Sequence, residues 1–122
     1  MERSSADLDV DVIALVPDLL FASRISSLAK SNARSLSIAS SLAELRQLLA
    51  NHRPRLVIVD LSARGVDVAA AIGAAKAANV PTVVAFGPHK DLAARAAALD
   101  AGADRWVTNQ RLVDVMADLW DS

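Results

Sequence analysis

The sequence of 122 residues contains no cysteine and no tyrosine, and only two phenylalanines and two tryptophans. The absence of cysteine excludes disulfides, thiolate metal sites and a cysteine nucleophile. With so few aromatic side chains, the core must be built mostly from aliphatic residues. A composition of 53% hydrophobic and 22% charged residues is typical of one soluble globular domain.

The sequence also lacks an excess of charge of either sign and a long apolar run. Its 13 basic and 14 acidic residues do not favour electrostatic capture of nucleic acid or of an anionic membrane. Charged residues interrupt each apolar stretch well short of the roughly 20 residues that span a bilayer, and the polar residues 1–5 lack the apolar segment of a secretory signal. We therefore expect a cytoplasmic protein that contacts neither nucleic acid nor membrane directly. No DNA-binding region follows Ser122, so direct transcriptional output needs a partner or a longer parent chain.

A glycine-rich phosphate loop is missing as well, because the glycines are scattered along the chain at Gly65, Gly73, Gly87 and Gly102. This absence disfavours a flavin- or nucleotide-binding domain, which we keep as an alternative.

What the sequence does contain is a regular alternation of two kinds of segment. After a polar lead-in over residues 1–8, the domain of residues 9–122 alternates short β-branched runs with longer alanine- and leucine-rich runs at helical spacing. Strands are predicted over residues 10–16, 36–39, 56–60, 82–86 and 105–108. Helices are predicted around Phe21, Ile25 and Leu28, from a capping box of Ser41 and Glu44, over residues 66–79, from an Asp91 cap to Gly102, and around residues 112–119.

Strands that alternate with helices of about 10 to 15 residues imply right-handed crossovers and a parallel sheet. We therefore predict an α/β fold, a doubly wound three-layer sandwich of five strands and five helices. In such sheets, ligands bind beyond the carboxyl ends of the strands. Functional residues are thus expected just after Val16, Val59, Phe86 and Thr108.

Two carboxylates follow strands at that edge, Asp18 after the first strand and Asp60 after the third. Two facing carboxylates repel unless a cation lies between them, and hard oxygen ligands suit Mg²⁺. Asp60 beside Mg²⁺ would be a candidate nucleophile toward a phosphoryl group. The structural alternative for Asp18 is to cap the first helix. For Asp60, which ends a buried strand where the fold demands no charge, we favour a role in the site over a cap.

The chain resembles a response-regulator receiver domain, the phospho-accepting module of two-component signalling, over about residues 9–121. The local matches are residues 56–60, similar to the acceptor strand, and residues 101–108, similar to the stretch before the family's lysine. The resemblance implies a flavodoxin-like (βα)5 sheet with strand order 2-1-3-4-5. It also implies Asp60 as the phosphoryl acceptor, and Mg²⁺ bound by Asp18, Asp60 and the backbone carbonyl of Ser62.

Three positions depart from the family pattern. Pro17 stands where the family has a first acidic residue, and Phe86 where it has a hydroxyl that contacts the phosphoryl oxygen. Asn109, followed by Gln110, stands where the family has a lysine that pairs with the phosphoryl group. Phosphoryl transfer depends on positioning and on countering the charge of the equatorial oxygens. We therefore expect Mg²⁺ binding and phosphorylation to be weakened or lost, as in an atypical or pseudo-receiver.

Trp106 holds the position of the family's switch aromatic, which moves together with the hydroxyl after the fourth strand. With Phe86 in the hydroxyl position, we expect the space beside Trp106 to be filled. The switch would then be locked, or would answer to partner binding instead. The structural alternatives are plain edge-strand packing for Trp106 and core filling for Phe86.

The sequence thus predicts a receiver-like domain that is not an enzyme and acts mainly through protein–protein interaction. The expected partner is a sensor kinase, another signalling protein, or a second copy bound through the fourth helix, fifth strand and fifth helix. Interface candidates are Trp106, Arg111 and Trp120. The alternatives are a domain still phosphorylated on Asp60 with Mg²⁺, and a small-molecule-binding flavodoxin-like domain.

Overall fold

The structure, a computed structural model, describes residues 10–120, apart from the side chains of residues 115–117, 119 and 120. Strands and helices alternate in the order β1 (Val12–Leu15), α2 (Leu19–Ser31), β2 (Leu36–Ala39), α3 (Leu42–Asn51), β3 (Leu56–Asp60), α4 (Val68–Ala77), β4 (Thr82–Gly87), α5 (Leu92–Asp100), β5 (Arg105–Thr108) and α6 (Asn109–Trp120). The predicted strands and the predicted helix over residues 66–79 agree with these bounds to within two residues. The lead-in predicted over residues 1–8 lies outside the described residues.

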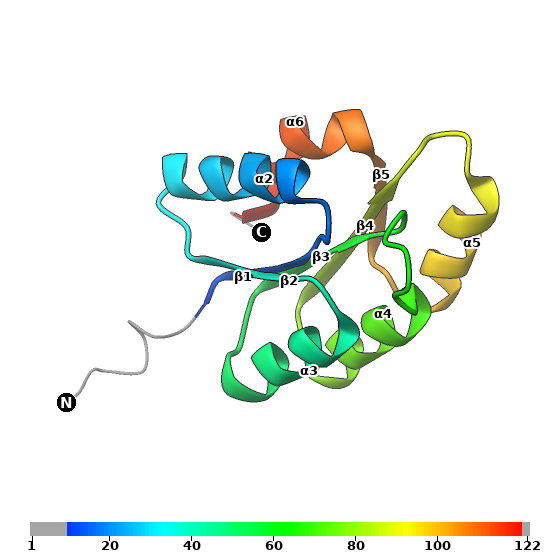
Figure 1. The fold of residues 1–122 in the computed structure, drawn as a ribbon, viewed down its shortest axis with the longest axis horizontal. Coiled ribbons are helices and arrows are strands. Elements are labelled where there is room, and N and C mark those ends of the chain that lie inside the picture. Colours follow the sequence, from blue (N-terminus) through cyan, green and yellow to red (C-terminus); the bar gives the residue numbers. More distant parts are fainter. Residues whose placement is uncertain (1–9, 121–122) are drawn as a thin grey trace.

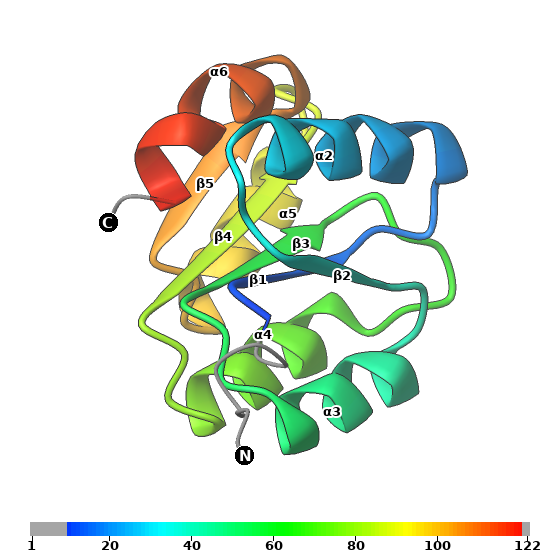
Figure 2. The same cartoon turned by 90° about the vertical axis from the view of Figure 1, so that its left-hand side faces the viewer.

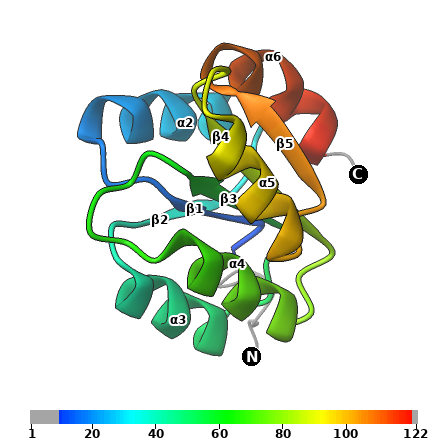
Figure 3. The same cartoon turned by 90° about the vertical axis from the view of Figure 1, so that its right-hand side faces the viewer.

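The five strands form one parallel sheet in the order β2-β1-β3-β4-β5, so the predicted fold class and strand order are confirmed. Helices α2 and α6 cover one face, and α3, α4 and α5 cover the other (Figures 1 and 2). Turned to its other side, the molecule shows α5 lying over β4 and β5 (Figure 3). Among the described helices, none is long and apolar enough to cross a membrane.

Two hydrophobic clusters lie on opposite faces of the sheet because alternate strand residues point to opposite sides. On the α2/α6 face, Ile58 and Phe86 pack with Ile25 of α2. On the other face, Val57 and Ala85 pack with residues of α3, α4 and α5. The central strands are buried on both faces, which explains their nearly continuous apolar sequences.

Side-chain caps fix where the helices begin. The predicted Asp91 cap is present, since its Oδ1 accepts a 3.0 Å hydrogen bond from the Ala94 N–H. Ser41 caps α3 as predicted, with its Oγ accepting from the Glu44 N–H at 3.1 Å. The reciprocal half of the capping box differs, because Glu44 Oε1 accepts from the N–H and the hydroxyl of Ser40 instead of Ser41.

The junction between β5 and α6 has no connecting residue. β5 ends at Thr108 and α6 begins at Asn109. The Thr108 Oγ1 accepts a 3.2 Å hydrogen bond from the Arg111 N–H, which occupies one of the backbone donors that a helix start leaves open. This arrangement places the first turn of α6 directly at the carboxyl edge of the sheet.

Candidate functional site

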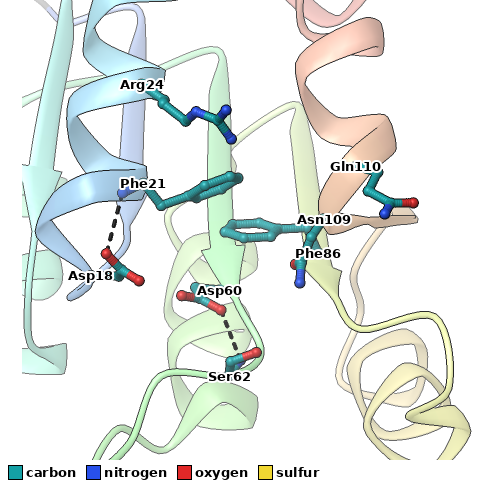
Figure 4. A pocket seen from close by; sticks show the side chains of 8 residues that line it. All are labelled: Asp18, Phe21, Arg24, Asp60, Ser62, Phe86, Asn109 and Gln110. Carbon is teal, nitrogen blue, oxygen red and sulfur yellow. Dashed lines mark hydrogen bonds between the residues drawn. The ribbon is translucent and has the colours of Figure 1, made fainter.

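A cavity of about 330 Å³ opens at the carboxyl edge of the sheet, where the sequence predicted functional residues. Its wall is formed by the segments that follow β1, β3 and β5, by the start of α2 and by the end of β4 (Figure 4). The lining residues are Asp18, Phe21, Arg24, Asp60, Ser62, Phe86, Asn109 and Gln110. The structure therefore brings together five of the residues singled out in the sequence: Asp18, Asp60, Ser62, Phe86 and Asn109.

Strand register aims Asp60 into this cavity. Asp60 pairs with Phe86, and Phe86 pairs with Val107. Paired residues of parallel strands point to the same face, and Phe86 and Val107 belong to the cluster under α2 and α6. Asp60 therefore faces α2, at the end of a strand whose other residues are all buried.

Asp60 is the one buried charged residue in the described part of the chain, with 7% of its surface exposed. Its Oδ1 accepts a 2.8 Å hydrogen bond from the Ser62 N–H. Burial raises the pKa of the Asp60 carboxyl above its usual value, because removal from water disfavours the charged form. Hydrogen bonding by Ser62 opposes this rise, and the negative charge of Asp18 adds a smaller upward contribution to the same pKa.

Asp18 takes the structural role that the sequence left open for it, that of a helix cap. Its Oδ1 accepts hydrogen bonds from the Leu20 N–H at 2.9 Å and the Phe21 N–H at 3.3 Å, so it caps α2. It also lines the cavity with Asp60. In both carboxylates, Oδ1 is the atom that accepts the backbone hydrogen bonds.

The donor set fits Mg²⁺ in part. Two carboxylates that share a cavity, with the Ser62 backbone beside them, are oxygen ligands of the kind that Mg²⁺ prefers. A third carboxylate is missing: Pro17 stands beside Asp18, and no group of three or more His, Cys, Asp or Glu suited to a metal occurs among the described residues. The cavity thus offers oxygen ligands that suit Mg²⁺, but one carboxylate fewer than a site in which position 17 is also acidic.

A pair of aromatic rings forms the side of the cavity above Asp60. Phe86, with 2% of its surface exposed, lies with its ring centroid 5.0 Å from that of Phe21, at an interplanar angle of 36°. Figure 4 shows the two rings between Arg24 and Asp60. The predicted core role of Phe86 is therefore present, and it is combined with a place in the cavity wall.

Sequence reasoning missed Phe21, Arg24 and Gln110 as lining residues. Phe21 was assigned to the apolar face of its helix, which is correct, since it packs against the buried cluster. The signal that could have placed it in the site is its spacing. It follows Asp18 by three residues, so the two lie on the same side of the first helical turn.

The expectation that Phe86 fills the space beside Trp106 is wrong. Trp106 pairs with Ala85, and both belong to the cluster on the α3–α5 face, whereas Phe86 belongs to the cluster on the α2/α6 face. The sheet therefore separates the two aromatic side chains. Filling of the Phe86 position cannot by itself lock Trp106.

Trp106 is half-buried and lies under α5, away from the Asp60 cavity. The guanidinium carbon of Arg95 is 5.2 Å from the centroid of the Trp106 ring, a cation–π distance. The ring nitrogen Nε1 is buried and has no hydrogen-bond partner within the described residues. Trp106 thus packs on an edge strand, in the place that the structural alternative gives it.

The remaining predicted residues lie on or near α6. Asn109 is exposed and lines the cavity from the start of this helix, together with its neighbour Gln110. Arg111 is exposed one residue further along, and its N–H bonds Thr108. Trp120 is predicted as an interface residue, and its side chain lies outside those that the structure describes.

No protein-family model matches the chain, and no curated protein matches it. Solved structures do. The receiver domain of NtrX from Brucella abortus is similar over 92% of this chain and 99% of that domain, with a TM-score of 0.77 and 17% identity. The receiver domain of TorR, the response regulator of the TMAO respiratory system, matches 90% of this chain and 96% of that one, with a TM-score of 0.77 and 20% identity.

A third similar structure is the receiver domain of the sensor histidine kinase PA1611 from Pseudomonas aeruginosa PAO1. It is similar over 93% of this chain and 99% of that domain, with a TM-score of 0.77 and 12% identity, and it is described with a magnesium ion coordinated in its active-site cleft. At these identities the likeness shows the fold. This chain has the fold of response-regulator receiver domains.

Proposed function

We propose that the chain is a cytoplasmic, non-enzymatic receiver-like domain of two-component signalling. Its output is protein–protein binding, and its Asp60 site is a degenerate phosphorylation site. The observation that carries this proposal is the wall of the Asp60 cavity, which includes the Phe86 ring, in tilted contact with Phe21, and the Asn109 amide. These are the two positions at which the family resemblance implies a hydroxyl and a lysine. The receiver fold and the position of Asp60 at the end of β3 support the signalling role.

The physical argument concerns the charge on a phosphoryl group. Its equatorial oxygens need positive charge or strong hydrogen-bond donors around them. Asn109 offers a neutral amide, which is a weaker donor than a charged one. Phe86 offers none, and the ring pair separates the Arg24 guanidinium from Asp60 (Figure 4). The site therefore stabilises a phosphoryl group poorly.

The test is incubation with acetyl phosphate and Mg²⁺, followed by intact-protein mass spectrometry. We expect no phosphorylated species for the wild-type chain. We expect phosphorylation in the double variant Phe86→Thr/Asn109→Lys, because it restores the hydroxyl and the cation. Asp60→Asn in that background is the control and should abolish the reaction. Phosphorylation of the wild-type chain at millimolar acetyl phosphate would contradict a degenerate site.

A second candidate function is that of a domain still phosphorylated on Asp60 with Mg²⁺. It is favoured by the cavity that Asp18 and Asp60 line together, in which two carboxylates can meet a cation. The magnesium ion in the similar PA1611 domain supports it further. Asp18 and Asp60 would hold the ion there, and its charge would offset the repulsion between the two carboxylates and incoming phosphoryl oxygens.

Magnesium binding can be measured apart from phosphorylation, by thermal unfolding with increasing MgCl₂. If the site holds Mg²⁺, the melting temperature rises with MgCl₂, and the rise is lost in both Asp18→Asn and Asp60→Asn. An equal rise in all three proteins would mean that the effect does not come from this site.

Partner binding through α5, β5 and α6 is part of the same proposal. Trp106 lies on this side, with Arg95 over its ring. The partner is a sensor kinase, another signalling protein or a second copy. If a second copy binds there, sedimentation at rising concentration shows a dimer that Arg95→Glu weakens.

A further inference from the structure

The charges that line the Asp60 cavity do not balance. Among the lining residues, Asp18 and Asp60 are acidic and Arg24 is the one cation. Figure 4 shows the ring pair of Phe21 and Phe86 between this cation and the Asp60 carboxylate. Asp60, with 7% of its surface exposed, forms no ion pair with any described residue, although buried carboxylates are normally paired. The cavity therefore presents a negative charge that the described part of the chain does not itself neutralise.

The other walls of the cavity suit an organic group. The Phe21 and Phe86 rings, with centroids 5.0 Å apart, supply no ligand to a metal, but aromatic rings pack against hydrocarbon and attract cations. Asn109 and Gln110 add neutral amides, whose carbonyl oxygens can accept N–H donors without repelling a cation. Carboxylates, phenyl rings and amide oxygens together are the groups that hold an ammonium or guanidinium on a hydrocarbon stem.

The size of the cavity points the same way. Its volume of about 330 Å³ lies at the lower end of the range of small-ligand pockets, which is roughly 300 to 1,000 Å³. An octahedral Mg²⁺ has six ligands, and each water takes roughly 30 Å³ of the liquid, so a hydrated ion would leave about half of this space unfilled. The cavity has room for the hydrocarbon part of a ligand as well as for its charged group.

We propose that this cavity binds a small organic cation, in which a primary ammonium or guanidinium group is joined to a short hydrocarbon stem. The charged group meets the carboxylates of Asp18 and Asp60, and the stem packs against the ring pair. The inference rests on the proposed function and deepens it, because it gives the degenerate phosphorylation site a ligand of its own.

The test is an NMR titration of the isotope-labelled chain at neutral pH and constant ionic strength. The probes have similar shapes and differ in charge: the cation phenethylammonium, the neutral phenethyl alcohol and the anion hydrocinnamate. The backbone N–H groups of Leu20, Phe21 and Ser62 report on the site, because they donate to its two carboxylates. The Ala94 N–H donates to the Asp91 carboxylate outside the cavity and is the internal control.

We expect phenethylammonium to shift the Leu20, Phe21 and Ser62 signals with a dissociation constant of about 1 mM, and to leave the Ala94 signal in place. Phenethyl alcohol should bind at least about tenfold more weakly, because it lacks the charge that the carboxylates recognise. Hydrocinnamate should not bind, because the carboxylates repel it.

Variants of the protein locate the ammonium group. Asp60→Asn should weaken phenethylammonium at least about tenfold, because it removes the buried charge and keeps the shape of the side chain. Asn109→Lys should weaken it to a similar extent, since it adds a competing cation to the cavity wall. The matched controls are Asp91→Asn, at another helix cap, and Gln47→Lys, at an exposed position of α3. Both controls should bind phenethylammonium as the wild-type chain does.

Several results would overturn the proposal. They are the absence of a shift with phenethylammonium, equal binding of phenethyl alcohol, and equal losses in the variants and their controls. MgCl₂ provides a further arm. If it moves the Leu20, Phe21 and Ser62 signals while phenethylammonium does not, the cavity is a metal site only.

The titration contains no phosphoryl donor, so this proposal and the proposed function can fail separately. Phosphorylation of the wild-type chain by acetyl phosphate would contradict the degenerate site, whatever the amine titration shows. Failure of phenethylammonium to bind, with no phosphorylation of the wild-type chain, would contradict the organic-cation ligand alone.

Discussion

The two faces of the sheet are packed in different ways. On the α3–α5 face, α4 and α5 bring three fully buried alanines against the sheet, Ala71, Ala75 and Ala98, beside larger side chains such as Leu45 and Ile72. On the α2/α6 face the packing uses larger side chains such as Phe86 and leaves the cavity at its carboxyl edge. On the α3–α5 face the buried alanines allow helix and strand to lie close together. The α2/α6 face retains a cavity in which a ligand or a reacting group can be bound.

The largest expected effect is a loss of stability on the α2/α6 face, which contains the cavity. Phe86→Ala should lower the free energy of unfolding by about 3 to 5 kcal/mol, because it empties a buried aromatic position. Urea unfolding measures it. Phe21→Ala is the comparison within the ring pair and should lose less, since Phe21 is half-buried. A loss below about 1 kcal/mol for Phe86→Ala would show that the ring pair does not hold this face together.

On the α3–α5 face, a loss of stability should come from added side-chain volume instead of from removed volume. Ala75→Leu should destabilise the fold by about 1 to 3 kcal/mol, because α4 has no space between this position and the sheet. Ala77→Leu, an exposed position on the same helix, should stay near the wild-type value in the same urea experiment. Equal stability of the two variants would mean that the α3–α5 face is not closely packed at Ala75.

Two aspartates that cap helices allow an effect on stability to be distinguished from an effect on the cavity. Asp18→Ala and Asp91→Ala should each lower the free energy of unfolding by about 1 kcal/mol, because each removes the side-chain acceptor at a helix start. If the site holds Mg²⁺, so that the melting temperature of the wild type rises with MgCl₂, only Asp18→Ala should alter that response. If both variants lose that response, the effect comes from helix stability and not from the cavity.

The smallest effect is a pH dependence at Asp60. Because the pKa of Asp60 is raised on folding, the folded state holds this proton more tightly than the unfolded chain. The free energy of unfolding therefore decreases as pH rises through the raised pKa. Asp60→Asn should be more stable than the wild type at neutral pH, by up to about 1 kcal/mol. The difference should shrink as pH falls, measured by thermal unfolding across pH, while Asp100→Asn, on the exposed end of α5, serves as the control.

The order of elements could be predicted because its signals are local. The apolar run of residues 56–60, the cap at Asp91 and the positive φ of 113° at Gly102 each depend on neighbouring residues in the chain. The carboxyl-edge position of Asp18 and Asp60 followed from the same order. These features need no knowledge of which side chains touch.

The contacts within the site could not be predicted in this way. The contact of Phe21 with Phe86 in the site joins α2 and β4, and outside the site the contact of Arg95 with Trp106 joins α5 and β5. The faces of Phe86 and Trp106 depend on strand register, in which Phe86 pairs with Val107 and not with Trp106. A shift of one residue reverses the face of every side chain, so a family position alone did not place these two relative to each other.

The direct junction of β5 and α6 has a mechanical consequence. A hinge needs a few residues whose backbone angles can change, and none lies between Thr108 and Asn109. A change in the angle between α6 and the sheet would therefore have to come from the backbone angles of the terminal residues themselves, Thr108 and Asn109, since no loop lies between the two elements.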